Sequence, residues 1–370
     1  MKKFYHIILI LFFLFELSGC KGKVNIEDIT LSLILGIDMD DQGQVEMYMA
    51  SPVFSKDAKE KNEVIKVKGL SLRDARNYFD TMVNGITSGG KVQSVLIGMK
   101  VLQEENWFDY LDLLYRDPKI RLNSDVIAVN GSVSEVFDLK LKDKPRLSIF
   151  IPQLVETANF RNVSVKTSLR KLYQMHYEDG IATYLPELKV ENGALVLSGT
   201  SLLADGKYIQ TLPLHETQLF KLLEGKLKGQ FAFVIELNEN KNKLGRNKAV
   251  TSFYVKDYKR NIEAKFKNKH YSFVINLKIP IEITESPYRL SDQSESKLKK
   301  IIDSKLQDEF NELIKTLQQN KIDPIGLGII ARATNYPEWK KIEDHWETGF
   351  HDSEIKVNVK TIIVDRGKSM

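Results

Sequence analysis

Residues 271–283 (YSFVINLKIPIEI) and residues 292–319 (DQSESKLKKIIDSKLQDEFNELIKTLQQ) decide the fold of the second half of the chain. The first stretch is rich in β-branched and aromatic residues, which predicts a long β-strand. The second stretch has apolar residues at every third or fourth position, which predicts an amphipathic helix. Its apolar stripe consists of Leu298, Ile301, Ile302, Leu306, Phe310, Leu313, Ile314 and Leu317.

The apolar stripe has two interpretations. A single long helix beside a sheet has a face to cover, so we expect this helix to pack across its own sheet. The alternative is a coiled-coil surface for a partner helix.

Further strand patterns surround these two segments. Residues 231–237 and 249–255 are strand-like, and such long strands in succession favour an antiparallel sheet. A hairpin over residues 194–212 precedes them. Residues 354–364 (EIKVNVKTIIV) alternate between apolar and polar, and we expect this last strand to complete the same sheet.

The first half of the chain alternates between strands and helices. Residues 29–38 and 44–52 bracket an Asp/Gln/Gly turn and predict a hairpin. Ser71, with Asp74 three positions later, predicts the start of a helix. We expect the face of this helix that carries Leu72, Ala75, Phe79, Met82, Val83 and Ile86 to point into the core. The alternation favours an α/β or α+β architecture.

Turn residues suggest where the chain divides. Glu191, Asn192 and Gly193 form a turn-like sequence between two strand patterns. We therefore expect an N-terminal α/β region over residues 28–191, with room for two subdomains, and a C-terminal α+β domain over residues 192–367.

The N-terminus has the layout of an export signal. Lys2 and Lys3 precede the apolar run 7–15, which is too short to cross a bilayer that needs about 20 residues. Residues 17–20 (LSGC) are typical of a bacterial lipobox, which predicts a signal peptide over residues 1–19 and lipidation of Cys20. Cys20 is the only cysteine, so an incidental cysteine after an ordinary signal peptide is the weaker alternative. Residues 20–27 then form a short tether to an extracytoplasmic body.

Composition limits the function further. A hydrophobic content of 42% and only ten prolines are typical of a globular protein. The formal net charge of +5 is mostly interspersed. Its densest stretch, residues 241–248 (KNKLGRNK), is either a solvated hairpin loop or a contact for anionic headgroups. Nothing resembles a nucleic-acid-binding module, so we expect no nucleic-acid partner.

No pattern supports catalysis or metal binding. The six histidines contain no HExxH pair, and no GxSxG motif is present. Residues 85–91 (GITSGGK) match part of a phosphate-binding loop, but Val92 replaces the required Ser or Thr. His345 and His351 lack an obvious third ligand, so we expect packing roles for them. We therefore expect no enzyme activity, no cofactor and no metal.

Four stretches taken together resemble a known family. They are the lipobox followed by residues 33–53 (LILGIDMDDQGQVEMYMASPV), then residues 114–131 (LYRDPKIRLNSDVIAVNG), residues 195–229 and residues 321–346 (KIDPIGLGIIARATNYPEWKKIEDHW). In order and spacing they are similar to the Ger(x)C family, the lipoprotein C subunits of spore germinant receptors. The resemblance covers almost the whole chain. It implies an α+β, multi-domain fold with mixed and antiparallel sheets flanked by helices.

The resemblance also implies a function. Ger(x)C proteins sit lipid-anchored on the outer face of the inner spore membrane and work with membrane-spanning A and B subunits. The complex responds to nutrients, and the C subunit has no known enzymatic activity. A solute-binding lipoprotein of an importer is the alternative, although such proteins usually have two lobes with parallel sheets and a hinge.

One segment supplies candidate structural positions of the family. The glycines in the DPIGLG sequence permit a tight turn and close backbone approach. Two tryptophans follow, for which core packing is expected and an exposed interface is the alternative. The candidate positions are Asp323, Pro324, Gly326, Gly328, Pro337, Trp339 and Trp346.

Overall fold

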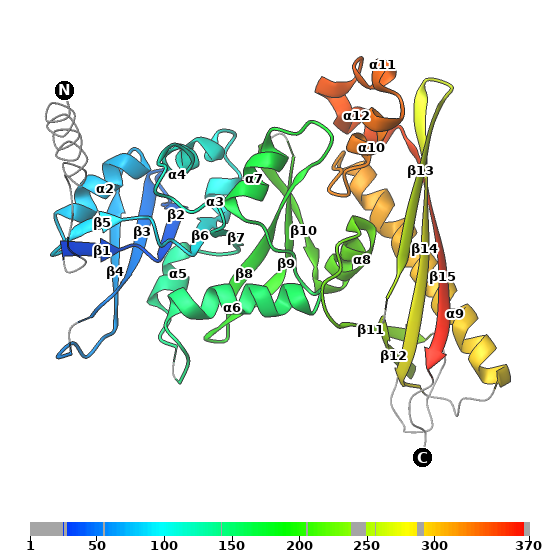
Figure 1. The fold of residues 1–370 in the computed structure, drawn as a ribbon, viewed down its shortest axis with the longest axis horizontal. Coiled ribbons are helices and arrows are strands. Elements are labelled where there is room, and N and C mark those ends of the chain that lie inside the picture. Colours follow the sequence, from blue (N-terminus) through cyan, green and yellow to red (C-terminus); the bar gives the residue numbers. More distant parts are fainter. Residues whose placement is uncertain are drawn as a thin grey trace, which may run out of the picture.

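The structure is a computed structural model that describes residues 25, 28–54, 56–141, 143–204, 206–237, 249–255, 257–286 and 292–365. Two large sheets lie at opposite ends of an elongated body, with helices packed on both (Figure 1). The predicted signal peptide, Cys20, most of the tether and the basic stretch 241–248 lie outside the described residues.

The first sheet has eight strands and mixed direction. Strands β2, β6, β7 and β8 are mutually parallel, and antiparallel strands extend the sheet on both sides. A separate parallel pair, β1 (Ile29–Leu31) and β5 (Ile86–Ser88), lies beside it. In spatial order the eight strands are β10 (Lys207–Pro213), β9 (Ala194–Ala204), β8 (Thr183–Glu191), β7 (Asp125–Val129), β6 (Ser94–Gly98), β2 (Ile34–Met39), β3 (Val45–Pro52) and β4 (Asn62–Lys68).

Helices cover both faces of this sheet, because successive strand residues point to opposite sides. In β6, Val95 and Ile97 join one buried cluster while Leu96 joins another. One face carries α2 (Leu72–Asp80), α3 (Met99–Leu102), η2 (Trp107–Leu111), α4 (Asp112–Arg116) and α7 (Leu169–His176). The other face carries α5 (Val133–Asp138) and α6 (Leu147–Phe160).

Helix α2 begins as predicted but ends early. The Ser71 hydroxyl accepts a hydrogen bond from the Asp74 amide at 3.1 Å, which caps the helix. The helix ends at Asp80, whose carboxylate accepts a hydrogen bond from the Thr87 amide at 2.8 Å. The predicted helical face therefore does not continue, and the expectation that Met82 and Ile86 are buried is wrong, since both are exposed.

The turn at residues 191–193 lies between β8 and β9, and both strands belong to the first sheet. The hairpin β9–β10 therefore adds two strands to that sheet, and the second sheet starts with β11 at Phe231. The division of the chain at residues 191 and 192 stays a prediction.

The second sheet is organised around β14 (His270–Glu285). One edge of β14 pairs with β12 (Ala249–Val255) and then β13 (Lys259–Lys267), both antiparallel, and β11 (Phe231–Leu237) pairs with β12. Its other edge pairs with β15 (Glu354–Asp365). That last strand completes the sheet as predicted. It runs parallel to β14, whereas β11, β12 and β14 pair antiparallel as their patterns favour, so the sheet is mixed.

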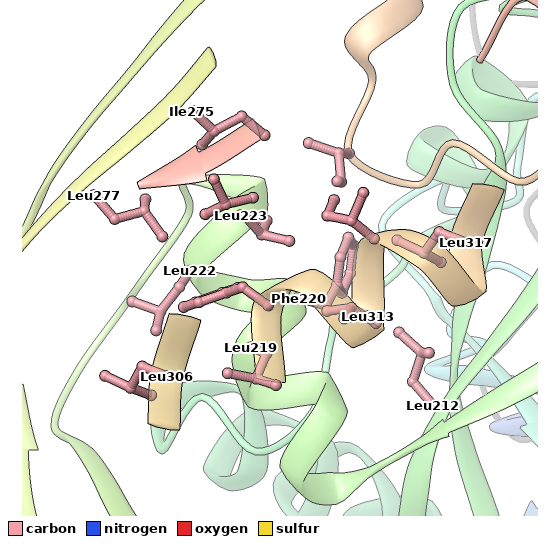
Figure 2. Close-up of a cluster of buried hydrophobic side chains, with 14 of the residues drawn as sticks. Leu212, Leu219, Phe220, Leu222, Leu223, Ile275, Leu277, Leu306, Leu313 and Leu317 are labelled. Carbon is pink, nitrogen blue, oxygen red and sulfur yellow. The ribbon is translucent and has the colours of Figure 1, made fainter. Parts of the chain in front are cut away.

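Helix α9 (Asp292–Gln319) packs against this sheet, as the sequence predicts for its apolar stripe. Helix α8 (Leu214–Glu224) lies beside α9, and leucines of both helices meet Ile275 and Leu277 of β14 (Figure 2). The same core continues into Tyr184 and Leu202 of the first sheet, so the two sheets share buried residues. Four short helices follow α9, namely α10 (Leu327–Thr334), α11 (Tyr336–Trp339), η3 (Glu343–His345) and α12 (Trp346–His351).

Polar side chains of α9 also cover the outer edge of β15. The Gln307 side chain donates to the Val357 carbonyl at 2.6 Å and accepts from the Val359 amide at 3.2 Å. Asp303 accepts from the Thr361 amide at 2.8 Å. These groups satisfy backbone atoms that a further strand would otherwise bind.

Candidate functional site

The Asp323 carboxylate organises the segment between α9 and α10. Its Oδ1 accepts a hydrogen bond from the Gly326 amide at 2.9 Å, and its Oδ2 accepts one from the Gly328 amide at 2.9 Å. The Trp346 indole donates to the same Oδ2 at 3.0 Å. Asp323 thereby ties the DPIGLG turn to α12, and it is buried.

This segment also joins the two halves of the chain. The Asp323 carbonyl accepts a hydrogen bond from the Ala182 amide at 2.7 Å, just before β8. A Cβ on Gly328 would lie 2.6 Å from both Gly180 Cα and Trp346 Nε1, so only glycine fits there. Gly326 has φ of 81°, a left-handed conformation that favours glycine.

The predicted positions separate into two groups. Asp323, Pro324, Gly326, Gly328 and Trp346 are brought together and buried. The buried Trp339 ring packs against the Trp346 ring at a centroid distance of 5.1 Å. Pro337 is exposed in the first turn of α11 and is not part of the junction.

Burial raises the pKa of Asp323, because a carboxylate loses hydration in the interior. The hydrogen bonds from Trp346 and from the Gly326 and Gly328 amides favour the charged form and oppose that shift. The donors around this side chain match a carboxylate acceptor, which is a structural role.

A cleft of about 390 Å³ opens beside this junction, between the two halves of the chain. Arg332 of α10 makes a paired contact to Glu178 at 2.8 and 2.9 Å on its rim. Burial and the nearby carboxylates of Glu178 and Glu343 raise the pKa of Asp179. Further acidic residues that line the cleft are Glu105, Asp344 and Glu347.

A buried ionic cluster surrounds Glu224. Glu224 of α8 contacts Lys171 at 3.4 Å, Lys221 at 3.3 Å and Lys226 at 3.6 Å, and it accepts a hydrogen bond from the Tyr184 hydroxyl. Burial opposes ionisation, but Lys171 and Lys221 outweigh it and lower the pKa of Glu224 to about 2. At Lys171 burial prevails and lowers the pKa to about 8. Sequence reasoning missed this cluster because Lys171 and Tyr184 are far from Glu224 along the chain.

The sequence analysis also did not predict an aromatic cluster at α7. The Phe108 and His176 rings stack at a centroid distance of 3.8 Å, and Tyr173 lies 4.6 Å from Tyr177. Phe108, Tyr173 and Tyr177 help to line a surface hollow of about 500 Å³. The four-residue spacing of Tyr173 and Tyr177 on and just after α7 was the available signal.

Two properties of the described residues bear on function classes. No helix in that part of the chain combines the length and the hydropathy that a membrane span needs. No group of three or more His, Cys, Asp or Glu side chains there is placed to hold a metal ion. His345 and His351 lie at the surface, where His351 contacts Asp352 at 2.8 Å.

The fold defines the class of protein, a mixed α+β chain with two sheets, as the sequence predicts. The chain belongs to the GerAC/GerBC-like family of spore germination proteins. The family model "Spore germination protein N-terminal domain" matches residues 22–190. The model "Spore germination B3/ GerAC like, C-terminal" matches residues 198–367. The resemblance to the Ger(x)C family is thereby confirmed.

Individual relatives match along nearly the whole chain. Spore germination protein GerQC of Bacillus cereus is 21% identical over 95% of this chain and 96% of its own length. Spore germination protein B3 of Bacillus subtilis is 23% identical over 96% of each chain. A solved structure described as the GerBC protein covers 90% of this chain and 97% of its own, with a TM-score of 0.60 and 19% identity. These names are those of germination proteins, not of enzymes.

Proposed function

We propose that this chain is a non-catalytic, lipid-anchored subunit of a nutrient germinant receptor in the spore. Its partners are two membrane-spanning subunits and the lipid bilayer. The observation that carries the proposal is the family match over both halves of the chain, together with the LSGC sequence at residues 17–20.

Lipidation of Cys20 places the body on the outer face of the inner spore membrane. Each buried methylene contributes about 0.8 kcal/mol to membrane attachment, so two or more acyl chains hold the protein stably. Anchoring also raises the effective concentration of this subunit near membrane-spanning partners, so a weak direct contact is enough for assembly. The shared core and the Asp323 junction support this role, because they link the two sheets.

The test is nutrient-triggered germination of spores that carry Cys20→Ala. We expect the variant protein to leave the membrane fraction and the response to one nutrient class to be lost. Nutrient-independent germination should persist, which controls for spore viability. Protein level is measured in parallel, so that degradation is not mistaken for loss of anchoring.

A deletion strain separates the remaining outcomes. Normal germination by Cys20→Ala spores whose variant protein is off the membrane would show that the anchor is dispensable. If the deletion is silent with every nutrient and the purified protein binds a solute tightly in calorimetry, the receptor assignment is overturned in favour of an importer component.

A further inference from the structure

Three apolar side chains are exposed at four-residue spacing near the start of the described chain. Tyr78 is 49% exposed, Met82 55% and Ile86 56%. Single exposed apolar residues are ordinary on protein surfaces. Three such residues within nine positions are a concentration of exposed apolar side chains along this segment, which we call the N-terminal patch.

The N-terminal patch has no role in the core of its own region. Helix α2 packs through Leu72, Ala75 and Phe79, which are buried. Met82 follows the end of the helix, and Ile86 is the outward-facing first residue of β5. The patch therefore exposes apolar area that the fold does not use.

The patch lies where the N-terminal segment joins the folded body. Ile86 pairs directly with Ile29, the first residue of β1. A Cβ on Gly85 would lie 2.8 Å from the Asp28 carbonyl, so the chain before β1 passes close to this turn. In Figure 1, α2, β1 and β5 lie at the end of the body opposite the second sheet.

The length of chain before β1 limits the distance between the N-terminal patch and a lipid anchor at Cys20. Ile29 lies nine positions after Cys20 along the chain. At about 3.3–3.6 Å per residue, a fully extended chain of that length spans about 30 Å. Any less extended conformation brings the N-terminal patch nearer to the membrane.

We propose that the N-terminal patch rests in the interfacial layer of the bilayer and orients the protein. The proposal rests on lipidation of Cys20, as argued above. Tyrosine is favoured at the headgroup level, and Met and Ile side chains gain by leaving water for the acyl boundary. The second sheet, at the far end of the body, then points away from the membrane (Figure 1).

The test uses the mature lipidated chain in vesicles of phosphatidylcholine and phosphatidylglycerol that contain brominated lipid. Met82→Cys introduces a single free thiol, because the only native cysteine carries the lipid. A fluorophore on that thiol reports contact with lipid through bromine quenching. The matched control is Val234→Cys on β11, which is 56% exposed and lies in the second sheet.

We expect the label at position 82 to be quenched about threefold or more above the label at position 234, because interfacial side chains reach the acyl boundary. Ile86→Cys serves as a second reporter if the first variant folds poorly. Equal quenching at both positions, with the protein still floating with the vesicles, would overturn the patch proposal and leave the anchor intact. Failure of the protein to float would instead overturn the anchor.

The same experiment also tests whether a protein, not lipid, covers the N-terminal patch. If the label at position 82 is unquenched in lipid vesicles but becomes shielded in vesicles that also hold the membrane-spanning subunits, the patch binds those subunits. That result overturns the bilayer as its occupant.

Discussion

Trp346 supplies a directional contact inside a tightly packed region. Its indole N–H binds Asp323 Oδ2, and a buried carboxylate that loses a donor is costly. The Gly328 backbone lies directly against the indole nitrogen, which fixes the position of the ring. A change at this residue therefore affects the turn, α12 and the contact with Gly180 together.

The substitution Trp346→Phe should lower the free energy of unfolding by about 2 kcal/mol or more, because it removes a hydrogen bond to a buried charge and leaves a small cavity. Urea titration measures the change. Trp339→Phe is the matched control, since no contact between its indole nitrogen and Asp323 is present among the described residues. Equal losses for the two variants would mean that the hydrogen bond contributes little.

The sequence predicted the turn glycines but not the contacts that explain them. A DPIGLG stretch suggests close backbone approach by local chemistry alone. That Gly328 meets Gly180 depends on how distant elements dock, and no local pattern contains that information. The same limit applies to Met82 and Ile86, whose spacing fits a longer helix than the one that forms.

At the scale of elements, α9 has two structural roles. Its apolar stripe packs on the sheet, and Gln307 and Asp303 bind the outer edge of β15. An open strand edge is a template for pairing with another chain, so this cover also guards against association.

The substitution Gln307→Met keeps the side-chain length but removes both contacts to β15. We expect a loss of about 1–2 kcal/mol in unfolding free energy, from two backbone hydrogen bonds. We also expect new concentration-dependent association in sedimentation velocity. Lys315→Met, at an exposed position of the same helix, is the control. A monomeric Gln307→Met protein of unchanged stability would refute the protective role.

Elements with strong periodicity were the most predictable. The helix over residues 292–319 and strands β11, β12, β14 and β15 follow directly from their apolar spacing, whereas β13 was not predicted. The direction of β15 does not, because strand pairing is decided by the path of the intervening α9 and the short helices. The hairpin β9–β10 shows the same limit, since its pattern does not say which sheet it joins.

At the scale of the molecule, the Glu224 cluster couples the two halves. Lys171 comes from α7 and Tyr184 from β8 of the first sheet, whereas Glu224 is on α8. The pKa of Glu224 in the folded protein is about 2, below its ordinary value of 4.5. The contribution of this carboxylate to stability is therefore complete above about pH 4.5 and is lost as pH falls towards 2.

The substitution Glu224→Gln should lower the free energy of unfolding by about 3 kcal/mol at pH 7, because buried lysines lose their counter-charge. The difference between wild type and variant should shrink as pH falls from 4.5 towards 2, as wild-type Glu224 becomes protonated. Urea unfolding at pH 7, 4 and 3 measures this difference in unfolding free energy. Glu191→Gln, at the exposed end of β8, controls for the loss of a surface carboxylate and its ion pair with Lys189. A difference that does not change with pH would contradict the assignment.

The parallel pairing of β15 with β14 has a consequence for biogenesis. A chain is synthesised amino end first, and domains begin to form as their residues emerge. One edge of β14 and much of the apolar face of α9 must wait for residues 354–365, which follow all the other strands described. The second half of the molecule thus closes only once residues 354–365 have been added. A chain that stops short of residue 354 has an unfinished core that is open to proteolysis.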